Sequence, residues 1–316
     1  MTITQSPPET AELPLDEAAA EAFAGRLIEV LNSASLAVLT SIGHQTGLFD
    51  TLSTLPSSTS QQIADAAGLN ERYVREWLGG VTTADVVRYD PATSTYWLPR
   101  EHAAFLTSAA GPDNLARVMQ YVAMMGEVEQ QIIGCFRNGG GLPYSAYPRF
   151  HEVMAEESAG VYDAALVDVI VPLVPGLTER LTSGIEAADV GCGRGHAINV
   201  LATAFPASRF TGFDFSEEAI GEARSEAQHL CLGNAQFEVC DVATLRALDR
   251  FHLVTAFDAI HDQAHPGVVL ANIARSLRPG GVFLMQDIKA SSKVEENIEL
   301  PWATMLYAVS TLHCMS

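Results

Sequence analysis

The chain has 316 residues, of which 48% are hydrophobic, and it carries a formal net charge of −20. This length and composition predict two domains with cores of their own, while so acidic a surface repels nucleic-acid phosphates. The five cysteines are odd in number and include no C-x-x-C pair, which indicates reduced thiols and a cytoplasmic location.

The amino-terminal segment and the apolar stretches predict no leader and no membrane anchor. Residues 1–14 are polar, acidic and proline-bearing, which is unlike a signal peptide and predicts a disordered tail. The longest apolar stretch, residues 164–177, contains Asp168 and prolines and is too short to span a bilayer. We therefore expect no membrane partner.

Residues 15–110 are predicted to form a mainly helical domain. After a first helix with apolar residues at helical spacing, residues 59–68 form a short capped helix that ends at a glycine. Asn70 caps a second helix over residues 71–78, and a polar hairpin follows over residues 87–97. Helix, helix and β-wing in this order predict a winged helix-turn-helix domain.

A winged-helix domain raises the alternative that the protein is a transcriptional regulator that reads DNA. Residues 1–110 contain five arginines, no lysine and thirteen acids, a net charge of −8. The expected recognition helix carries charges that nearly cancel, at Glu71, Arg72, Arg75 and Glu76. Because DNA affinity comes largely from neutralised phosphates, we expect no nucleic-acid partner. The apolar helices of this domain instead favour a homodimer.

Residues 111–160 are predicted to be a helical connector that carries a lid. The helix expected over residues 114–133 contains methionines that serve as core filler or line pockets for apolar ligands, at positions 119, 124 and 125. The glycines 139–141 then precede three aromatic residues, Tyr144, Tyr147 and Phe150. These aromatics form either a lid over a ligand or an ordinary surface loop.

The segment Asp189-Val-Gly-Cys-Gly-Arg-Gly195 is the most informative stretch of the chain. A short apolar run precedes it and a helix-like segment follows, the order of strand, glycine-rich turn and helix that cradles nucleotides. Gly191 and Gly193 allow a tight turn and a close approach of the backbone to a ligand. A dinucleotide fingerprint would place its third glycine at position 196, where the chain has His196.

Two acids follow the next two predicted strands. Asp214 comes 19 residues after Gly195, at the end of a strand, where a carboxylate accepts hydrogen bonds from both ribose hydroxyls of a nucleotide. The alternative role for Asp214 is to cap the helix that begins near Ser216. Asp241 follows the strand over residues 235–240. A buried run, a Pro-Gly-Gly turn and a further apolar strand then extend the pattern to Asp287.

These glycines and acids resemble those of class I S-adenosylmethionine-dependent methyltransferases, over residues 181–287. The resemblance implies S-adenosylmethionine as the cofactor, with Asp214 on the ribose and Asp241 on the adenine amino group. It assigns cofactor binding to Asp189, Gly191, Cys192, Gly193, Gly195, Asp214, Phe215, Asp241, Val242 and Phe257. Gly47-Leu-Phe-Asp50, followed by the winged unit, resembles the dimerising amino-terminal domain of plant and bacterial small-molecule O-methyltransferases.

The expected fold is α/β, with a Rossmann-like parallel sheet of order 3-2-1-4-5 in residues 161–316 behind a mainly α winged-helix domain. Family members end this sheet with two further strands. Only 29 residues follow Asp287, enough for a linker and one helix over about residues 296–312. We therefore expect a sheet without its last two strands, in a chain that is incomplete at its carboxyl end.

The loop after the fourth strand of this sheet is the expected place of catalysis, because ligands bind at the carboxyl ends of parallel strands. His261-Asp262 lies there and resembles the catalytic histidine segment of the O-methyltransferases. A neutral imidazole with a pKa near 6.5 suits a general base, and the resemblance implies that Asp287 orients it. Gln263 departs from the tryptophan that usually follows His-Asp in that family.

Three alternatives remain open for this loop. His261 is a capping or core histidine in the first, and Asp258 is the base in the second. In the third, Asp258, Asp262 and His265 hold a metal, but their spacing matches no known ligand pattern, so we expect no metal. The sequence thus predicts a cytoplasmic, homodimeric S-adenosylmethionine-dependent methyltransferase that methylates a small, partly apolar molecule at oxygen.

Overall fold

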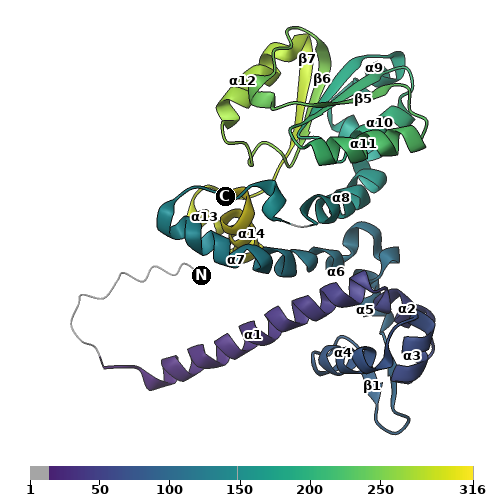
Figure 1. Cartoon of the computed structure of the whole chain (residues 1–316), viewed down its shortest axis with the longest axis vertical. Coiled ribbons are helices and arrows are strands. Elements are labelled where there is room, and N and C mark those ends of the chain that lie inside the picture. Colours follow the sequence, from purple (N-terminus) through teal and green to yellow (C-terminus); the bar gives the residue numbers. More distant parts are fainter. Residues whose placement is uncertain (1–13, 148, 316) are drawn as a thin grey trace.

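The structure, a computed structural model, describes residues 14–147 and 149–315. Figure 1 shows an α/β unit at one end of the molecule, a helical layer in the middle and a second, mainly helical unit at the other end. The expected disordered tail, residues 1–14, lies almost wholly outside the described residues.

The amino-terminal unit has the predicted winged-helix order. Its helices are α1 (Glu17–Gln45), α2 (Leu48–Thr54), α3 (Ser60–Ala67), α4 (Glu71–Thr83) and α5 (Arg100–Leu106). Thr59 caps α3 in a capping box, and Asn70 caps α4, which continues past its expected end at Leu78. The wing is the antiparallel hairpin of β1 (Arg88–Asp90) and β2 (Thr95–Trp97).

A single apolar cluster holds the winged-helix unit together. Phe49 of α2 packs edge-on against Trp77 of α4, with ring centroids 5.3 Å apart. The indole N–H of Trp77 donates to the carbonyl of Leu39 on α1 at 2.8 Å, which satisfies the polar atom of a buried aromatic. The carboxyl-terminal half of α1 is thereby fixed to the winged-helix core.

The amino-terminal half of α1 extends beyond this core (Figure 1). Phe23, Leu27 and Leu31 are more than half exposed and, at four-residue spacing, share one face of the helix. By length and composition α1 is also apolar enough to cross a membrane, with a mean hydropathy of 1.4 over its most apolar window. The sequence predicted this helix from its apolar spacing but not as a candidate membrane span, because asparagine, serines and threonine interrupt its apolar residues between positions 30 and 45.

The middle layer brings the connector and the carboxyl-terminal segment together. Its elements are α6 (Leu115–Val118), α7 (Gln120–Asn138), α8 (Phe150–Val161), the π-helix η3 (Tyr162–Ile170), α13 (Val294–Asn297), α14 (Ala303–Val309) and the π-helix η6 (Ser310–Cys314). Met124 and Met125 of α7 are buried in a cluster that also contains Leu312. These two methionines are therefore core residues, and the expected carboxyl-terminal helix is broken into separate pieces.

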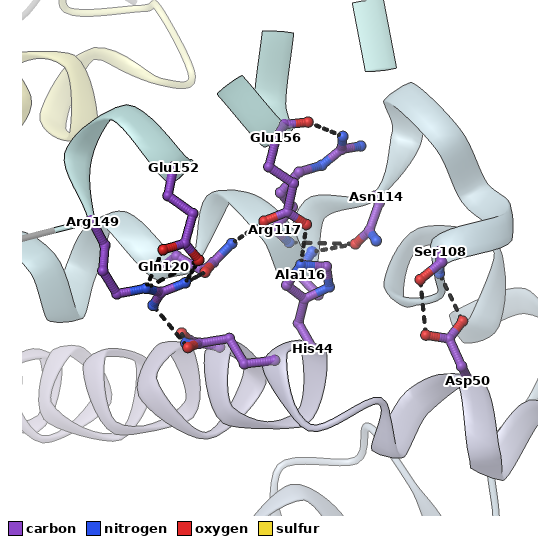
Figure 2. A network of polar contacts seen from close by, with 12 residues as sticks. His44, Asp50, Ser108, Asn114, Ala116, Arg117, Gln120, Arg149, Glu152 and Glu156 are labelled. Carbon is purple, nitrogen blue, oxygen red and sulfur yellow. Dashed lines mark hydrogen bonds and ion pairs between the residues drawn. The ribbon is translucent and has the colours of Figure 1, made fainter. Parts of the chain in front are cut away.

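A polar network ties α1 to the middle layer (Figure 2). His44 of α1 and Glu156 of α8 lie 2.6 Å apart, between Nε2 and Oε1. The guanidinium of Arg117, which is buried, donates to the backbone carbonyl of Glu156 at 2.6 Å, and Arg149 donates to Gln45 at 2.8 Å. Hydrogen bonds to charged groups are stronger than neutral ones, so this network fixes α8 against α1.

The α/β unit contains the predicted parallel sheet. Its strands are β3 (Glu186–Val190), β4 (Arg209–Asp214), β5 (Ala235–Val239), β6 (Phe251–Phe257) and β7 (Leu277–Gln286), in the order β5-β4-β3-β6-β7. The helices are α9 (Leu177–Ser183), α10 (His196–Ala204), α11 (Glu217–His229) and α12 (Pro266–Ser276). α10 and α11 cover one face of the sheet and α12 covers the other (Figure 1). The predicted doubly wound sheet, with strand order 3-2-1-4-5, is thus confirmed.

Two details differ from the expectation. The Pro-Gly-Gly turn belongs to β7, because Leu277 already pairs with Phe251 and the register shifts before Val282 pairs with Leu253. We also expect from the sequence a helix over about residues 152–171; it begins at Phe150 and becomes a π-helix at Tyr162. Among the residues described after Gln286 there is no further strand, as expected, and the segment packs on α7 instead of extending the sheet.

Candidate functional site

The glycine loop joins the end of β3 to the start of α10. Gly191, Gly193 and Gly195 have φ values of +70°, +51° and +75°, which favour glycine. A Cβ on Gly191 would lie 2.5 Å from the Cβ of Ala259, and one on Gly195 would lie 2.4 Å from Phe237. Nothing lies within 4 Å of a Cβ built on Gly193. The two outer glycines therefore permit close packing, and Gly193 borders open space.

Asp189 lies at the base of this loop and is 3% exposed. The hydroxyl of Thr255 on β6 donates to its Oδ1 at 2.6 Å. Burial raises the pKa of Asp189 to about 7, because the charged carboxylate loses its hydration, and the bond from Thr255 offsets only part of this effect.

Asp214 ends β4 and holds the glycine loop from the neighbouring strand. Its Oδ2 accepts from the backbone N–H of Gly193 at 2.9 Å, and its Oδ1 accepts from that of Ser216 at 2.9 Å. The hydroxyl of Ser216, and not Asp214, caps α11 through the N–H of Ala219. The helix-cap alternative for Asp214 is therefore wrong. Each carboxylate oxygen retains a lone pair for a further donor.

One cavity collects every residue that the sequence assigned to cofactor binding. It lies at the carboxyl ends of β3, β4 and β6, and its walls include Asp189, Gly191, Cys192, Gly193, Gly195, Asp214, Phe215, Asp241, Val242 and Phe257. The carboxylate of Asp241 accepts from the N–H of Ala243 at 2.9 Å. This is the strand end at which doubly wound sheets bind ligands.

Aromatic residues of the connector line this cavity. Tyr144 and Phe150 both line it, and the ring of Tyr144 meets that of Phe215 at 5.2 Å. Phe150 stacks on the ring of His313 from η6, with centroids 3.9 Å apart. Tyr147 is buried and donates its hydroxyl to the carbonyl of Leu312 at 2.6 Å. Tyr147 is buried, so these are not the aromatics of an ordinary surface loop; we call Tyr144, Tyr147 and Phe150 the aromatic roof.

His261 lies beside both of its expected acidic partners. Its Nδ1 is 2.6 Å from Oδ1 of Asp287, and its Nε2 is 3.2 Å from Oδ1 of Asp262. The interaction with Asp262 comes first among the causes that raise the pKa of His261 to about 11, ahead of Cys314 and against the opposing effect of burial. The expected ordinary imidazole pKa is therefore wrong, because two carboxylates favour the imidazolium.

The residues that the sequence suggested as metal ligands, Asp258, Asp262 and His265, are not the ones that the structure brings together. Among the described residues, the ligand atoms of His261, Asp262 and Cys314 lie within 4.8 Å of one another. His265 is instead an exposed residue at the start of α12. Asp258 lines the cavity and has a φ of +50°, directly after β6.

Two known families match separate parts of the chain. Residues 34–108 match the family described as Rv2258c-like winged HTH domain, and residues 181–311 match the family described as methyltransferase domain. The chain joins a winged-helix domain to a methyltransferase domain. The structure places the cavity and the cluster around His261 within or against the methyltransferase domain.

Several curated relatives of this part of the chain are named methyltransferases. The chain is 30% identical over 121 residues to a trans-aconitate 2-methyltransferase of Methylobacterium nodulans, which is 38% of this chain and 42% of the relative. It is 30% identical over 114 residues to a fatty-acid O-methyltransferase of Mycolicibacterium smegmatis, which is 36% of this chain and 40% of the relative. The chain thus spans less than half the length of these curated relatives.

Solved structures match both domains together. The mitomycin 7-O-methyltransferase MmcR has a TM-score of 0.68 at 20% identity, over 94% of this chain and 87% of that one. Human N-acetylserotonin methyltransferase, solved with its cofactor S-adenosylmethionine, has a TM-score of 0.64 at 17% identity, over 92% and 86%. These likenesses confirm the fold.

Sequence reasoning missed several residues of the methyltransferase domain that line the cavity. His196, at the start of α10, lies 2.8 Å from Glu226 and 2.9 Å from Asp163 of η3. Burial lowers the pKa of His196, but the two carboxylates outweigh it and raise the pKa above its usual value. The buried Nε of Arg194 has no hydrogen-bond partner in the part of the chain described. The sequence did mark His196, because it occupies the position where a dinucleotide fingerprint would have its third glycine.

A second cavity of about 390 Å³ borders the cluster around His261 on its other side. His261 and Cys314 line it, together with Ile288, Leu300, Leu306 and Val309. Asp262 lines the cavity of the glycine loop instead. The His261–Asp262 pair of the methyltransferase domain thus lies in the wall between a cavity with many polar groups and an apolar one.

Proposed function

We propose that the chain is an S-adenosylmethionine-dependent methyltransferase that acts on a small, partly apolar molecule, at an oxygen atom. The observation that carries the proposal is the convergence of all ten assigned residues on one cavity at the strand ends of a methyltransferase domain. The apolar cavity beside His261 has the size of small-molecule sites and fits an acceptor of this class.

The residues present fit this cofactor. Gly193 borders open space where the backbone can approach a ligand, and the unpaired Nε of Arg194 offers a donor for a carboxylate. Asp214 has lone pairs left for the ribose hydroxyls, and Asp241, which lines the same cavity, offers an acceptor for the adenine amino group. The bound cofactor supplies the activated methyl group, so the protein has to align the acceptor and exclude water.

Removing the acceptor proton is the proposed task of His261, with Asp287 orienting the ring through Nδ1 and Asp262 beside Nε2. In the arrangement described, both ring nitrogens face carboxylates. Because the two carboxylates raise the pKa of His261 to about 11, the base role requires Nε2 both to turn from Asp262 toward the acceptor and to lose its proton first. If it does so, His261→Ala should lower the transfer rate by about 10²–10⁴-fold and leave cofactor affinity nearly intact.

Calorimetric titration with S-adenosylmethionine tests the cofactor assignment. Asp214→Ala should weaken binding by roughly 2–4 kcal/mol, because two charge-assisted hydrogen bonds are lost. Gly193→Val should abolish binding, since its side chain would occupy the open space. Gly221→Ala on α11, where a Cβ meets nothing within 4 Å, is the matched control and should bind normally. Normal binding by Gly193→Val would refute the assignment, and screening metabolites with methyl-labelled cofactor then identifies the acceptor.

The alternative function, a DNA-binding regulator, has the winged-helix fold in its favour. On α4, however, Arg72 pairs with Glu76 and Arg75 pairs with Glu71, each at 3.7 Å. The two guanidinium groups are thus already compensated on their own helix, which leaves little positive charge for phosphates. Micromolar binding of mixed duplex DNA at low salt, without binding of S-adenosylmethionine, would reverse the ranking of the two functions.

We also propose that the chain forms a homodimer through the exposed face of α1. The other half of the same helix is packed in the winged-helix core, and a continuous apolar face of this kind usually meets a partner. Leu27→Glu should convert a dimer to a monomer in light scattering, whereas Tyr73→Glu, on the exposed side of α4, should not. A parent chain that is monomeric, or that floats with lipid vesicles, would contradict this assignment.

A further inference from the structure

Three side chains with different donor atoms converge where the methyltransferase domain meets the carboxyl-terminal segment. His261 and Asp262 come from the loop after β6, and Cys314 comes from the end of η6. Their nitrogen, oxygen and sulfur atoms all lie within 4.8 Å of one another. Neither the predicted base role nor the cofactor site accounts for Cys314.

The geometry of the pair from the loop is that of two ligands on one ion. Nε2 of His261 and Oδ1 of Asp262 are 3.2 Å apart. Two ligands of a tetrahedral zinc ion, each about 2.0–2.1 Å from the metal, lie about 3.3 Å apart. Oδ1 of Asp262 is moreover buried and has no aligned hydrogen bond among the described residues. A buried carboxylate oxygen of this kind is costly unless a cation or donor occupies the space beside it.

The second ring nitrogen of His261 is already bound as in metal sites. Nδ1 lies 2.6 Å from Oδ1 of Asp287, which also accepts from the N–H of Ile288 at 2.8 Å. Histidines that bind metals through Nε2 usually donate their other N–H to a carboxylate, which fixes the ring and its tautomer. Asp287 therefore orients Nε2 toward the space that it shares with Asp262 and Cys314.

The donor set decides between metals. Thiolate and imidazole ligands select zinc and similar borderline metals, whereas magnesium and calcium prefer oxygen alone. From these observations we propose that His261, Asp262 and Cys314 bind one zinc ion, with Asp287 as a positioning residue. Three protein ligands leave one tetrahedral position open, as in catalytic zinc sites.

The proposed zinc site lies between the two cavities, where it could bind the methyl acceptor. Asp262 lines the cavity of the glycine loop, while His261 and Cys314 line the apolar cavity. The open position of the metal therefore lies in the wall between them, where an acceptor hydroxyl can bind. Zinc lowers the pKa of a bound hydroxyl toward neutrality. A His261 that binds zinc through Nε2 has no lone pair for a proton, so the zinc site would replace the base role.

Metal content of the purified full chain tests the proposal directly. After incubation with one equivalent of zinc and gel filtration, the parent protein should retain about one equivalent. His261→Ala and Cys314→Ser should lose it, and Asp287→Asn should bind it about 10–100-fold more weakly. Cys135→Ser, which changes a cysteine on α7 outside the cluster, is the matched control and should retain the metal.

Cobalt provides a second measurement that does not depend on variants that fold. Cobalt(II) bound to the parent protein should show the intense visible absorption of a tetrahedral site and a thiolate-to-cobalt charge-transfer band. Zinc should displace both signals. A parent protein that retains no zinc, or a cobalt spectrum without thiolate character, would overturn the proposal. Neither readout involves S-adenosylmethionine, so the zinc site and the proposed methyl transfer succeed or fail separately.

Discussion

Replacing Asp189 by asparagine tests how the buried base of the glycine loop contributes to stability. The side chains have nearly the same shape, and the amide oxygen of asparagine can still accept the hydrogen bond that Thr255 donates at 2.6 Å. The substitution therefore removes the ionisable group and little else. It separates the electrostatic effect of Asp189 from its packing.

The magnitude follows from the raised pKa. Burial moves the pKa of Asp189 from 3.8 to about 7, which corresponds to about 4 kcal/mol as an upper limit. Between these values the folded state keeps the proton and the unfolded state has lost it. The free energy of unfolding therefore falls as pH rises from about 4 to about 7. Asp189→Asn should lack this decline and should gain stability relative to the parent near neutral pH.

Hydrogen exchange measured by mass spectrometry, with peptides from β3 and β6, reports the stability of this sheet apart from the winged-helix domain. The comparison is made at about pH 5 and about pH 7.5, after correction for the intrinsic exchange rates. Asp168→Asn, which changes an exposed carboxylate on η3, is the control and should keep the pH dependence of the parent. The same pH dependence in Asp189→Asn as in the parent would refute the reasoning.

Three further predictions concern other parts of the chain. Gly195→Ala should destabilise the methyltransferase domain by about 2–4 kcal/mol in urea titrations, because its Cβ would meet Phe237 at 2.4 Å in a left-handed conformation. Thr59→Ala should cost the winged-helix domain about 1 kcal/mol through the lost capping box, with peptides of β3 unchanged in hydrogen exchange. The interaction with His44 lowers the pKa of Glu156, so Glu156→Gln should reduce stability at neutral pH by less than about 1 kcal/mol, and the difference from the parent should vanish as pH falls below about 4.

The cofactor cavity could be predicted from the sequence because its residues lie at fixed places in a repeated local pattern. Each one follows a strand, and a parallel sheet brings the carboxyl ends of its strands together. Asp214 shows this well, since its position 19 residues after Gly195 placed it across the loop from Gly193. Only the structure could decide whether Asp214 caps the next helix, because the sequence around Asp214 is compatible with either role.

The contacts of His261 could be predicted only in part. The pairing with Asp287 follows from the adjacent strands β6 and β7. Cys314, in contrast, belongs to a segment that returns to the middle layer after α14, and no spacing in the sequence links it to the loop after β6. The raised pKa of His261 was missed for the same reason, since it depends on how closely several charged groups meet in space.

The aromatic roof has a consequence for how the enzyme completes a cycle. Phe150 rests on His313, and the next residue, Cys314, stands against His261. Tyr144 and Phe150 line the cavity proposed for the cofactor, so a movement of these two rings would widen the path by which a spent cofactor leaves. Such a movement would break the stacking of Phe150 on His313 of η6, whose residues Ser310 and Cys314 line the apolar cavity. We therefore expect that a bound acceptor slows cofactor release, so that the order in which products leave is set by the stacking of one phenylalanine on one histidine.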